Sequence, residues 1–108
     1  MVNVKLSPIV VKKLEDIKSH ISITLASPVA AQNTVNKIIE AIERLERFPD
    51  SAPLLSALYD KVPARYEDSR FLVCGNYIAI YIREVDIVNV LQLYHGSEDF
   101  IRHLLHTP

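Results

Sequence analysis

The sequence predicts an α+β domain in which an N-terminal strand and a helical hairpin pack on an antiparallel sheet, in the order β-α-α-β-β-β-α. Two observations predict this class. The first half twice places an amphipathic stretch after a Ser-Pro pair, and the second half holds three runs rich in Val, Ile and Tyr. The chain has 108 residues, 49% of them hydrophobic, which suffices for one buried core. We therefore expect residues 1–108 to form a single domain.

The first half of the chain is predicted to form a strand and two helices. Residues 1–6 alternate apolar and polar side chains, which is the period of a strand. Ser7-Pro8 and Ser27-Pro28 each combine a good helix cap with a residue suited to the first helical turn. Apolar residues then recur at helical spacings of three and four, at Val10, Leu14, Ile17, Ile21 and Leu25 and at Ala31, Val35, Ile38, Ile42 and Leu45. Because only a short loop separates the two helices, we expect them to lie antiparallel.

The second half is predicted to form a loop, three strands and a terminal helix. Residues 50–69 show no sustained period, and we expect a loop with one helical turn. Residues 70–73, 77–83 and 87–95 are rich in strand formers and are separated by short turns, so they form a meander. A last helix, capped by Ser97, has as its apolar side Phe100, Ile101, Leu104 and Leu105.

The middle strand of the meander has two different faces. One face carries Ile78, Ile80 and Ile82, and the other carries Tyr77, Ala79, Tyr81 and Arg83. One face can therefore pack on the helices while the second presents polar tips. We expect the tyrosine face to be the open one, and to be where chemistry could sit.

Composition excludes several classes of function. Twelve basic and thirteen acidic residues give a net charge of -1, so no global positive field draws the chain to nucleic acid. The single cysteine, Cys74, excludes an internal disulfide and multi-cysteine metal sites, and we expect it to be a half-buried thiol rather than a nucleophile. His20, His103 and His106 lack metal-ligand spacing, so we expect no metal and no other cofactor. Without a signal peptide or a long apolar run, we expect a cytoplasmic protein that does not contact membranes.

Two motifs in the second half carry a resemblance to a known family. In the first, an arginine opens a strand and a turn leads to G-N-Y-x-x-x-Y; the second is H-G-x-x-D followed by an aromatic residue. Their members are Arg70, Gly75, Asn76, Tyr77 and Tyr81, then His95, Gly96, Asp99 and Phe100. With the Leu45-x-x-Phe48-Pro49 close of the second helix and the order of elements, the chain resembles the RelE/ParE toxins of bacterial type II toxin–antitoxin modules. The resemblance covers nearly the whole length.

The resemblance implies a toxin held inactive by a cognate antitoxin in a hetero-oligomer, and it leaves the activity open. Members of the RelE branch enter the ribosomal A site and cut mRNA, whereas members of the ParE branch poison DNA gyrase without nuclease activity. Our first hypothesis is a ribosome-dependent, metal-independent mRNA endonuclease. The alternatives are a gyrase inhibitor and a degenerate, non-toxic member of the family.

The resemblance also implies roles for two residues in the nuclease hypothesis. Arg70 matches the family arginine that contacts the scissile phosphate, and a guanidinium suits this role because it can engage two phosphate oxygens. His95 matches a histidine that several family nucleases use as the general acid, and histidine can exchange protons near neutral pH. A solvated arginine and a histidine bonded to backbone are the structural alternatives.

Substrate binding in this hypothesis would fall to four further residues. Lys61 and Arg65 lie in the loop where nuclease members concentrate basic residues, although Glu67 and Asp68 are close by in sequence. Tyr77 and Tyr81 could stack on a base if they face the open side of the sheet. On a half-buried sheet, tyrosines more often belong to the core.

The charge of the second half departs from the family pattern. Residues 51–108 hold five Lys and Arg against seven Asp and Glu, a net charge of -2. Ser97 and Glu98 stand where many members have two arginines. Because nucleic-acid binding depends on neutralising phosphates, this deficit weakens the nuclease hypothesis.

Overall fold

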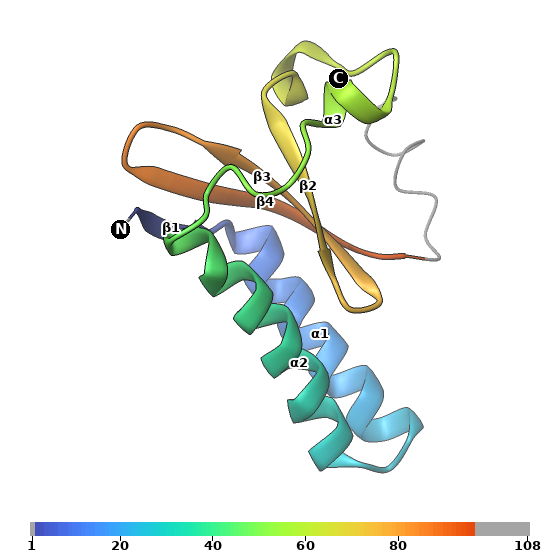
Figure 1. Ribbon diagram of the computed structural model, residues 1–108. Helices are drawn as coiled ribbons and strands as arrows, with labels where there is room; N and C mark the ends of the chain where they lie inside the picture. Colours follow the sequence, from blue (N-terminus) through green and yellow to red (C-terminus); the bar gives the residue numbers. More distant parts are fainter. Residues whose placement is uncertain (1, 97–108) are drawn as a thin grey trace.

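The computed structural model describes residues 2–96, and over this range the elements follow the predicted order (Figure 1). They are β1 (Asn3–Leu6), α1 (Pro8–Thr24), α2 (Pro28–Glu43), α3 (Leu55–Leu58), β2 (Ser69–Cys74), β3 (Tyr77–Arg83) and β4 (Ile87–His95). Short 3₁₀ turns occupy Arg44–Glu46 and Ala64–Tyr66. The α+β class is thus confirmed, and the loop holds the expected helical turn, at Leu55–Leu58, together with the 3₁₀ turn at Ala64–Tyr66. The helix expected after Ser97 lies outside the described residues.

Both helices of the hairpin begin at the predicted caps. The Ser7 hydroxyl accepts a hydrogen bond from the Val10 amide at 3.3 Å, and that of Ser27 accepts one from the Ala30 amide at 3.2 Å. Each satisfies an amide that the first helical turn would leave unpaired. The Ser7 hydroxyl also donates to the Leu91 carbonyl at 3.0 Å. The cap therefore ties the start of α1 to the sheet. No helix within residues 2–96 has the length and apolar character needed to cross a membrane.

The sheet has the strand order β1-β4-β3-β2. Strands β2, β3 and β4 form the predicted antiparallel meander, whereas β1 pairs with β4 in parallel, from Asn3 opposite Ile87 to Leu6 opposite Val90. The predicted antiparallel meander is therefore extended by β1 to a mixed sheet, and the orientation of this strand was not predicted. Alternation of apolar residues identifies a strand but does not specify its neighbour. Two parallel strands must be joined by a long crossover connection. Here the chain between Leu6, the end of β1, and Ile87, the start of β4, forms this connection.

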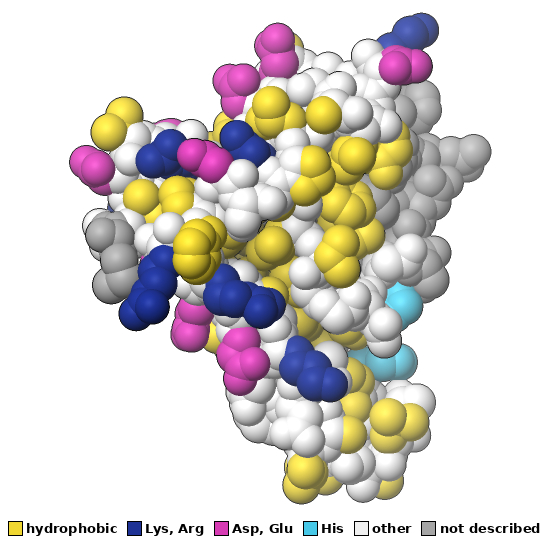
Figure 2. Space-filling model, in the orientation of Figure 1, with side chains coloured by type: hydrophobic (Ala, Val, Ile, Leu, Met, Phe, Trp, Pro, Cys, Tyr) yellow, Lys and Arg dark blue, Asp and Glu magenta, His cyan; other side chains and the backbone are white. Residues whose placement is uncertain are grey.

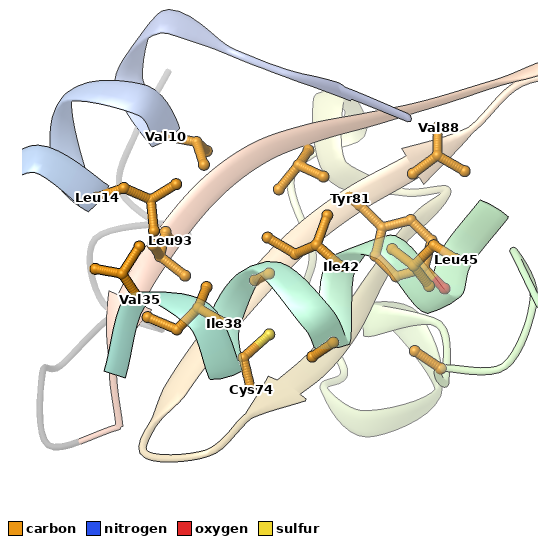
Figure 3. Close-up of a cluster of buried hydrophobic side chains, with 14 of the residues drawn as sticks. Val10, Leu14, Val35, Ile38, Ile42, Leu45, Cys74, Tyr81, Val88 and Leu93 are labelled. Atoms are coloured by element: carbon orange, nitrogen blue, oxygen red, sulfur yellow. The ribbon is translucent and has the colours of Figure 1, made fainter. Parts of the chain in front are cut away.

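The helical hairpin covers the tyrosine face of β3, not the isoleucine face as expected. Tyr81 and Ala79 are fully buried in the core between hairpin and sheet (Figure 3). Ile80, also fully buried, packs in a second cluster with Leu55 and Tyr66, which the loop between α2 and β2 lays over the opposite face. Both faces of β3 are apolar, so alternation shows which residues share a face but not which face the helices cover.

A register shift separates Ile80 from Tyr81 on β3. Ile80 lies opposite Gln92 of β4, whereas Tyr81 lies opposite Val90. Leu91 is thus the extra residue of a β-bulge, which bends a strand and increases its twist. The bulge keeps Val90 and Leu93 both in the core with the helices.

Candidate functional site

Arg70 holds the segment that follows the second helix against the sheet. It lies in β2 opposite Tyr81. Its Nη1 donates hydrogen bonds to the carbonyl oxygens of Ala52 at 2.6 Å and Asp50 at 3.3 Å. Its Nη2 lies 3.7 Å from the Asp50 carboxylate, and 22% of the side chain is exposed. The guanidinium is therefore engaged by the protein itself.

Two neighbouring side chains on β3 strengthen the same attachment. Arg83 Nη1 lies 3.0 Å from the Asp50 carboxylate, and the Tyr81 hydroxyl donates to the Pro49 carbonyl at 2.8 Å. Burial raises the pKa of the Tyr81 hydroxyl, so it remains a donor at neutral pH. We call Asp50, Arg70, Tyr81 and Arg83 the Asp50 cluster. In this cluster the guanidinium groups of Arg70 and Arg83 both bind the Asp50 carboxylate. The negative charge of Asp50 reduces the positive charge that the two arginines could offer to a phosphate.

His95 lies at the other end of the sheet. It ends β4 opposite Tyr77, and the two rings meet edge to face with centroids 5.0 Å apart. Both rings line a shallow depression of about 270 Å³ together with Asn76 and Gly96. The Gly96 amide donates to the Asn76 carbonyl at 2.7 Å, which joins the end of β4 to the β2–β3 turn. The structure thus brings His95 and Tyr77 together.

The structure does not bring Arg70 and His95 together. Their partners on β3, Tyr81 and Tyr77, are four residues apart, which is roughly 13 Å along a strand. Arg70 and His95 also lie on opposite sides of β3, which adds two strand spacings of about 4.8 Å each. A general acid and a phosphate-binding cation must both reach one reacting group within hydrogen-bond distance. The expected catalytic pair is therefore not assembled.

The remaining expected substrate-binding residues are scattered. Lys61 and Arg65 are exposed in the loop between α3 and β2. Arg65 Nη2 donates to the Tyr66 hydroxyl at 3.1 Å, and its guanidinium lies 4.9 Å from the centre of that ring. Tyr81 is 0% exposed, so it has no free ring face for a base, and the stacking role expected for it does not fit this core.

Sequence reasoning missed Asp50 as a partner of Arg70, and Arg83 as the second arginine that binds Asp50. Asp50 is separated from Arg83 by 33 positions and from Arg70 by 20. Neither lies in a motif: Arg83 was expected only on the tyrosine face of the middle strand, and Asp50 only at the start of the loop. The one available signal was Pro49, which was expected to close the second helix and directly precedes Asp50.

Cys74 is more deeply buried than expected. Its side chain is 1% exposed in the core, and burial raises the pKa of the thiol from 9.0 to about 11. The thiolate, which is the reactive form, is therefore scarce at neutral pH. Within residues 2–96, no group of three or more His, Cys, Asp or Glu could hold a metal ion.

We expect the Cys74 thiol to react with a soluble thiol reagent at pH 8 at least about tenfold more slowly in the native protein than in the protein unfolded in urea. In the unfolded chain the Cys74 thiol has its ordinary pKa of 9.0, whereas in the folded protein its pKa is about 11. The contribution of the protonated thiol to the stability of the folded protein is therefore fully present below pH 9, and it is lost as the pH rises through about 11. The absorbance of the chromophore that the reagent releases measures the rate of this reaction. Equal rates in native and unfolded protein would contradict the burial of Cys74.

Comparison with known proteins identifies the family. Residues 4–100 match the model of the ParE toxin of the type II toxin–antitoxin system parDE. A search of curated proteins gave no significant match. A solved chain described as the chromosomal ParDE toxin–antitoxin system from P. aeruginosa has the same fold, with a TM-score of 0.65 at 18% identity, over 88% of this chain and 96% of that one. Since the family model spans nearly the whole sequence, the chain belongs to the ParE toxin family of type II toxin–antitoxin systems.

Proposed function

We propose that this toxin arrests growth by binding DNA gyrase rather than by cutting mRNA. The main support is the separation of Arg70 from His95 along β3. A nuclease that used these two residues would need both at one phosphate, and Arg70 is committed to Asp50 and Ala52. A toxin that acts by binding needs no such assembly.

The distribution of charge supports the same proposal. Figure 2 shows basic side chains interspersed with acidic ones on the visible face, not a continuous basic surface. Residues 51–108 carry a net charge of -2, and Asp50 takes up part of the charge of Arg70 and Arg83. Binding inside the ribosome, a polyanion, would need phosphate neutralisation by clustered cations. A protein target makes no such demand.

Membership of the parDE family implies a cognate antitoxin as partner. In this proposal the two proteins form a hetero-oligomer in the cytoplasm, where gyrase is found, and the antitoxin keeps the toxin from its target. Co-expression with the product of the adjacent small gene should relieve growth arrest. It should also yield a complex that co-purifies.

The decisive experiment measures supercoiling and translation side by side with the purified toxin. We expect inhibition of gyrase supercoiling at stoichiometric toxin, and intact mRNA in a reconstituted translation reaction. His95→Gln should inhibit gyrase as strongly as the unchanged protein, because no proton transfer is involved. Cleavage of ribosome-bound mRNA that disappears in His95→Gln would instead establish the nuclease hypothesis. Expression without any growth arrest would identify a degenerate member of the family.

A further inference from the structure

The segment from α3 to the start of β2 covers one face of the sheet. Residues 55–68, which we call the lid, lie on the opposite side of the sheet from the helical hairpin (Figure 1). The buried side chains of the lid, Leu55 and Tyr66, are each 2% exposed and pack with Ile80 and Tyr94 of the sheet. The charged side chains of the lid are exposed to solvent. The lid therefore has an apolar inner side on the isoleucine face and a charged outer side.

Both ends of the lid are fixed to the sheet. Just before the lid, the Pro53 carbonyl accepts a hydrogen bond from the Phe71 amide at 3.0 Å. The Asp50 cluster holds the residues that precede Pro53. Just after the lid, Ser69 begins β2 and lies opposite Ile82 of β3. The two ends are therefore neighbours at the start of β2, as in compact surface loops whose ends lie close together.

Between these ends, the lid makes no backbone hydrogen bond to the sheet within residues 2–96. Its backbone hydrogen bonds join residues three or four positions apart, such as the Tyr59 amide with the Leu55 carbonyl and the Tyr66 amide with the Pro63 carbonyl. The Tyr66 hydroxyl accepts a hydrogen bond from Arg65, which also belongs to the lid. All these bonds can persist when the lid moves as a unit. Apolar contact is thus the main force that keeps it closed.

A buried hydroxyl without a partner lies beneath the lid. Ser69 is 0% exposed, and its Oγ has no hydrogen-bond partner in the described part of the chain. Ser69 precedes Phe71 by two positions in β2, so both side chains point to the face that the lid covers. Burying an unpaired hydroxyl costs free energy, and water would satisfy this hydroxyl if the lid opened. The closed state therefore contains a cost that opening removes.

We infer that the lid opens as a unit about its two fixed ends while the helical hairpin and the sheet stay folded. Opening takes Leu55 and Tyr66 off the sheet, uncovers Ile80 and Tyr94, and brings the Ser69 hydroxyl into water. The core between hairpin and sheet contains no side chain of the lid, so it remains intact. The lid thus gates the isoleucine face of the sheet. This inference is independent of the target that the toxin inhibits.

Two thiols on opposite faces of the sheet test the inference in one molecule. Ser69→Cys places a thiol beneath the lid, whereas the native Cys74, 1% exposed, lies in the core on the hairpin side. A soluble thiol reagent should label position 69 at least about tenfold faster than Cys74, which becomes accessible only when the core opens. Mass spectrometry of peptides measures each label. Equal rates at the two positions would overturn the inference, and so would a rate at position 69 as high as in urea.

Variants of the two clusters separate lid opening from global unfolding. In the Ser69→Cys protein, Leu55→Ala weakens the closed lid and should raise the labelling rate at position 69 about tenfold or more. Leu58→Ala is the matched control in α3, because Leu58 is 48% exposed, and it should leave this rate nearly unchanged. Ile38→Val weakens only the hairpin core. It should raise the rate at Cys74 about twofold or more and leave the rate at position 69 unchanged. A rise at both positions would overturn the inference.

Hydrogen exchange provides a second measurement if Ser69→Cys does not fold. In the unchanged protein, the hydrogen-bonded amide of Tyr66 should exchange through lid opening and depend little on low concentrations of urea. The amides of β3 should require global unfolding. Ser69→Ala removes the unpaired hydroxyl and should slow exchange at Tyr66 about fivefold or more. Unchanged or faster exchange in Ser69→Ala, or a urea dependence at Tyr66 equal to that of β3, would overturn the inference.

Discussion

Replacing Tyr81 by alanine is expected to lower the free energy of unfolding by about 3 to 5 kcal/mol, the cost usual for removing a buried aromatic ring. Tyr81 is the largest fully buried side chain of the described residues and belongs to the core between hairpin and sheet. Its removal leaves a cavity that the paired strands around it cannot easily close. Its hydroxyl also holds the Pro49 carbonyl. Urea denaturation followed by circular dichroism measures the change.

Tyr81→Phe separates the ring from the hydroxyl. It keeps the packing and leaves the Pro49 carbonyl without its donor, so a loss of about 1 kcal/mol is expected. A cost of Tyr81→Ala no larger than that of Tyr81→Phe would contradict the burial of the ring. A base-stacking tyrosine would behave differently, because its replacement would reduce RNA binding and leave stability nearly unchanged.

Replacing Arg70 by alanine is expected to cost about 2 to 3 kcal/mol of stability, mainly through hydrogen bonds from a charged donor to backbone carbonyls. The variant loses the donor to the Ala52 carbonyl and one of two partners of the Asp50 carboxylate. The ion pair itself contributes little because Asp50 is half exposed. Urea denaturation measures the loss. Limited proteolysis should show faster cleavage between residues 49 and 54.

Arg70→Lys provides the control for a catalytic role. A lysine can keep one of the hydrogen bonds but not the bidentate arrangement, so its stability should fall between those of Arg70→Ala and the unchanged protein. Growth arrest by the three proteins should follow the amount of folded toxin. A stable Arg70→Ala protein that had lost all toxicity would contradict the structural role of Arg70.

Local sequence signals predicted the helices well because helix formation depends on neighbours in the chain. Ser7 and Ser27 cap the helices where the Ser-Pro pairs indicated, since a cap needs only an amide three residues away. The apolar stripes of α1 and α2 face the core at Val10, Leu14, Val35 and Ile38. The strands were also found, and the pairing within the meander was predicted correctly, but the partner of β1 was not predicted.

The candidate site could be predicted only in part. The resemblance pointed to Arg70 and His95, and each lies on a strand as expected. Their separation depends on the register of three strands, which no local pattern contains. The Asp50 cluster depends on where the loop after α2 meets the sheet. A charge at Asp50 is compatible with many surface positions until the chain is folded.

The sequence by itself determined the order of the elements, the helix starts, which residues of β3 share a face, and the resemblance that the family match then confirmed. Only the tertiary structure decided that β1 runs parallel to β4, that the helices cover Tyr81 rather than Ile80, and that Arg70 binds Asp50 instead of meeting His95. Capping and periodicity act over a few residues. Strand pairing and the choice between two apolar faces depend on packing between residues far apart in the chain.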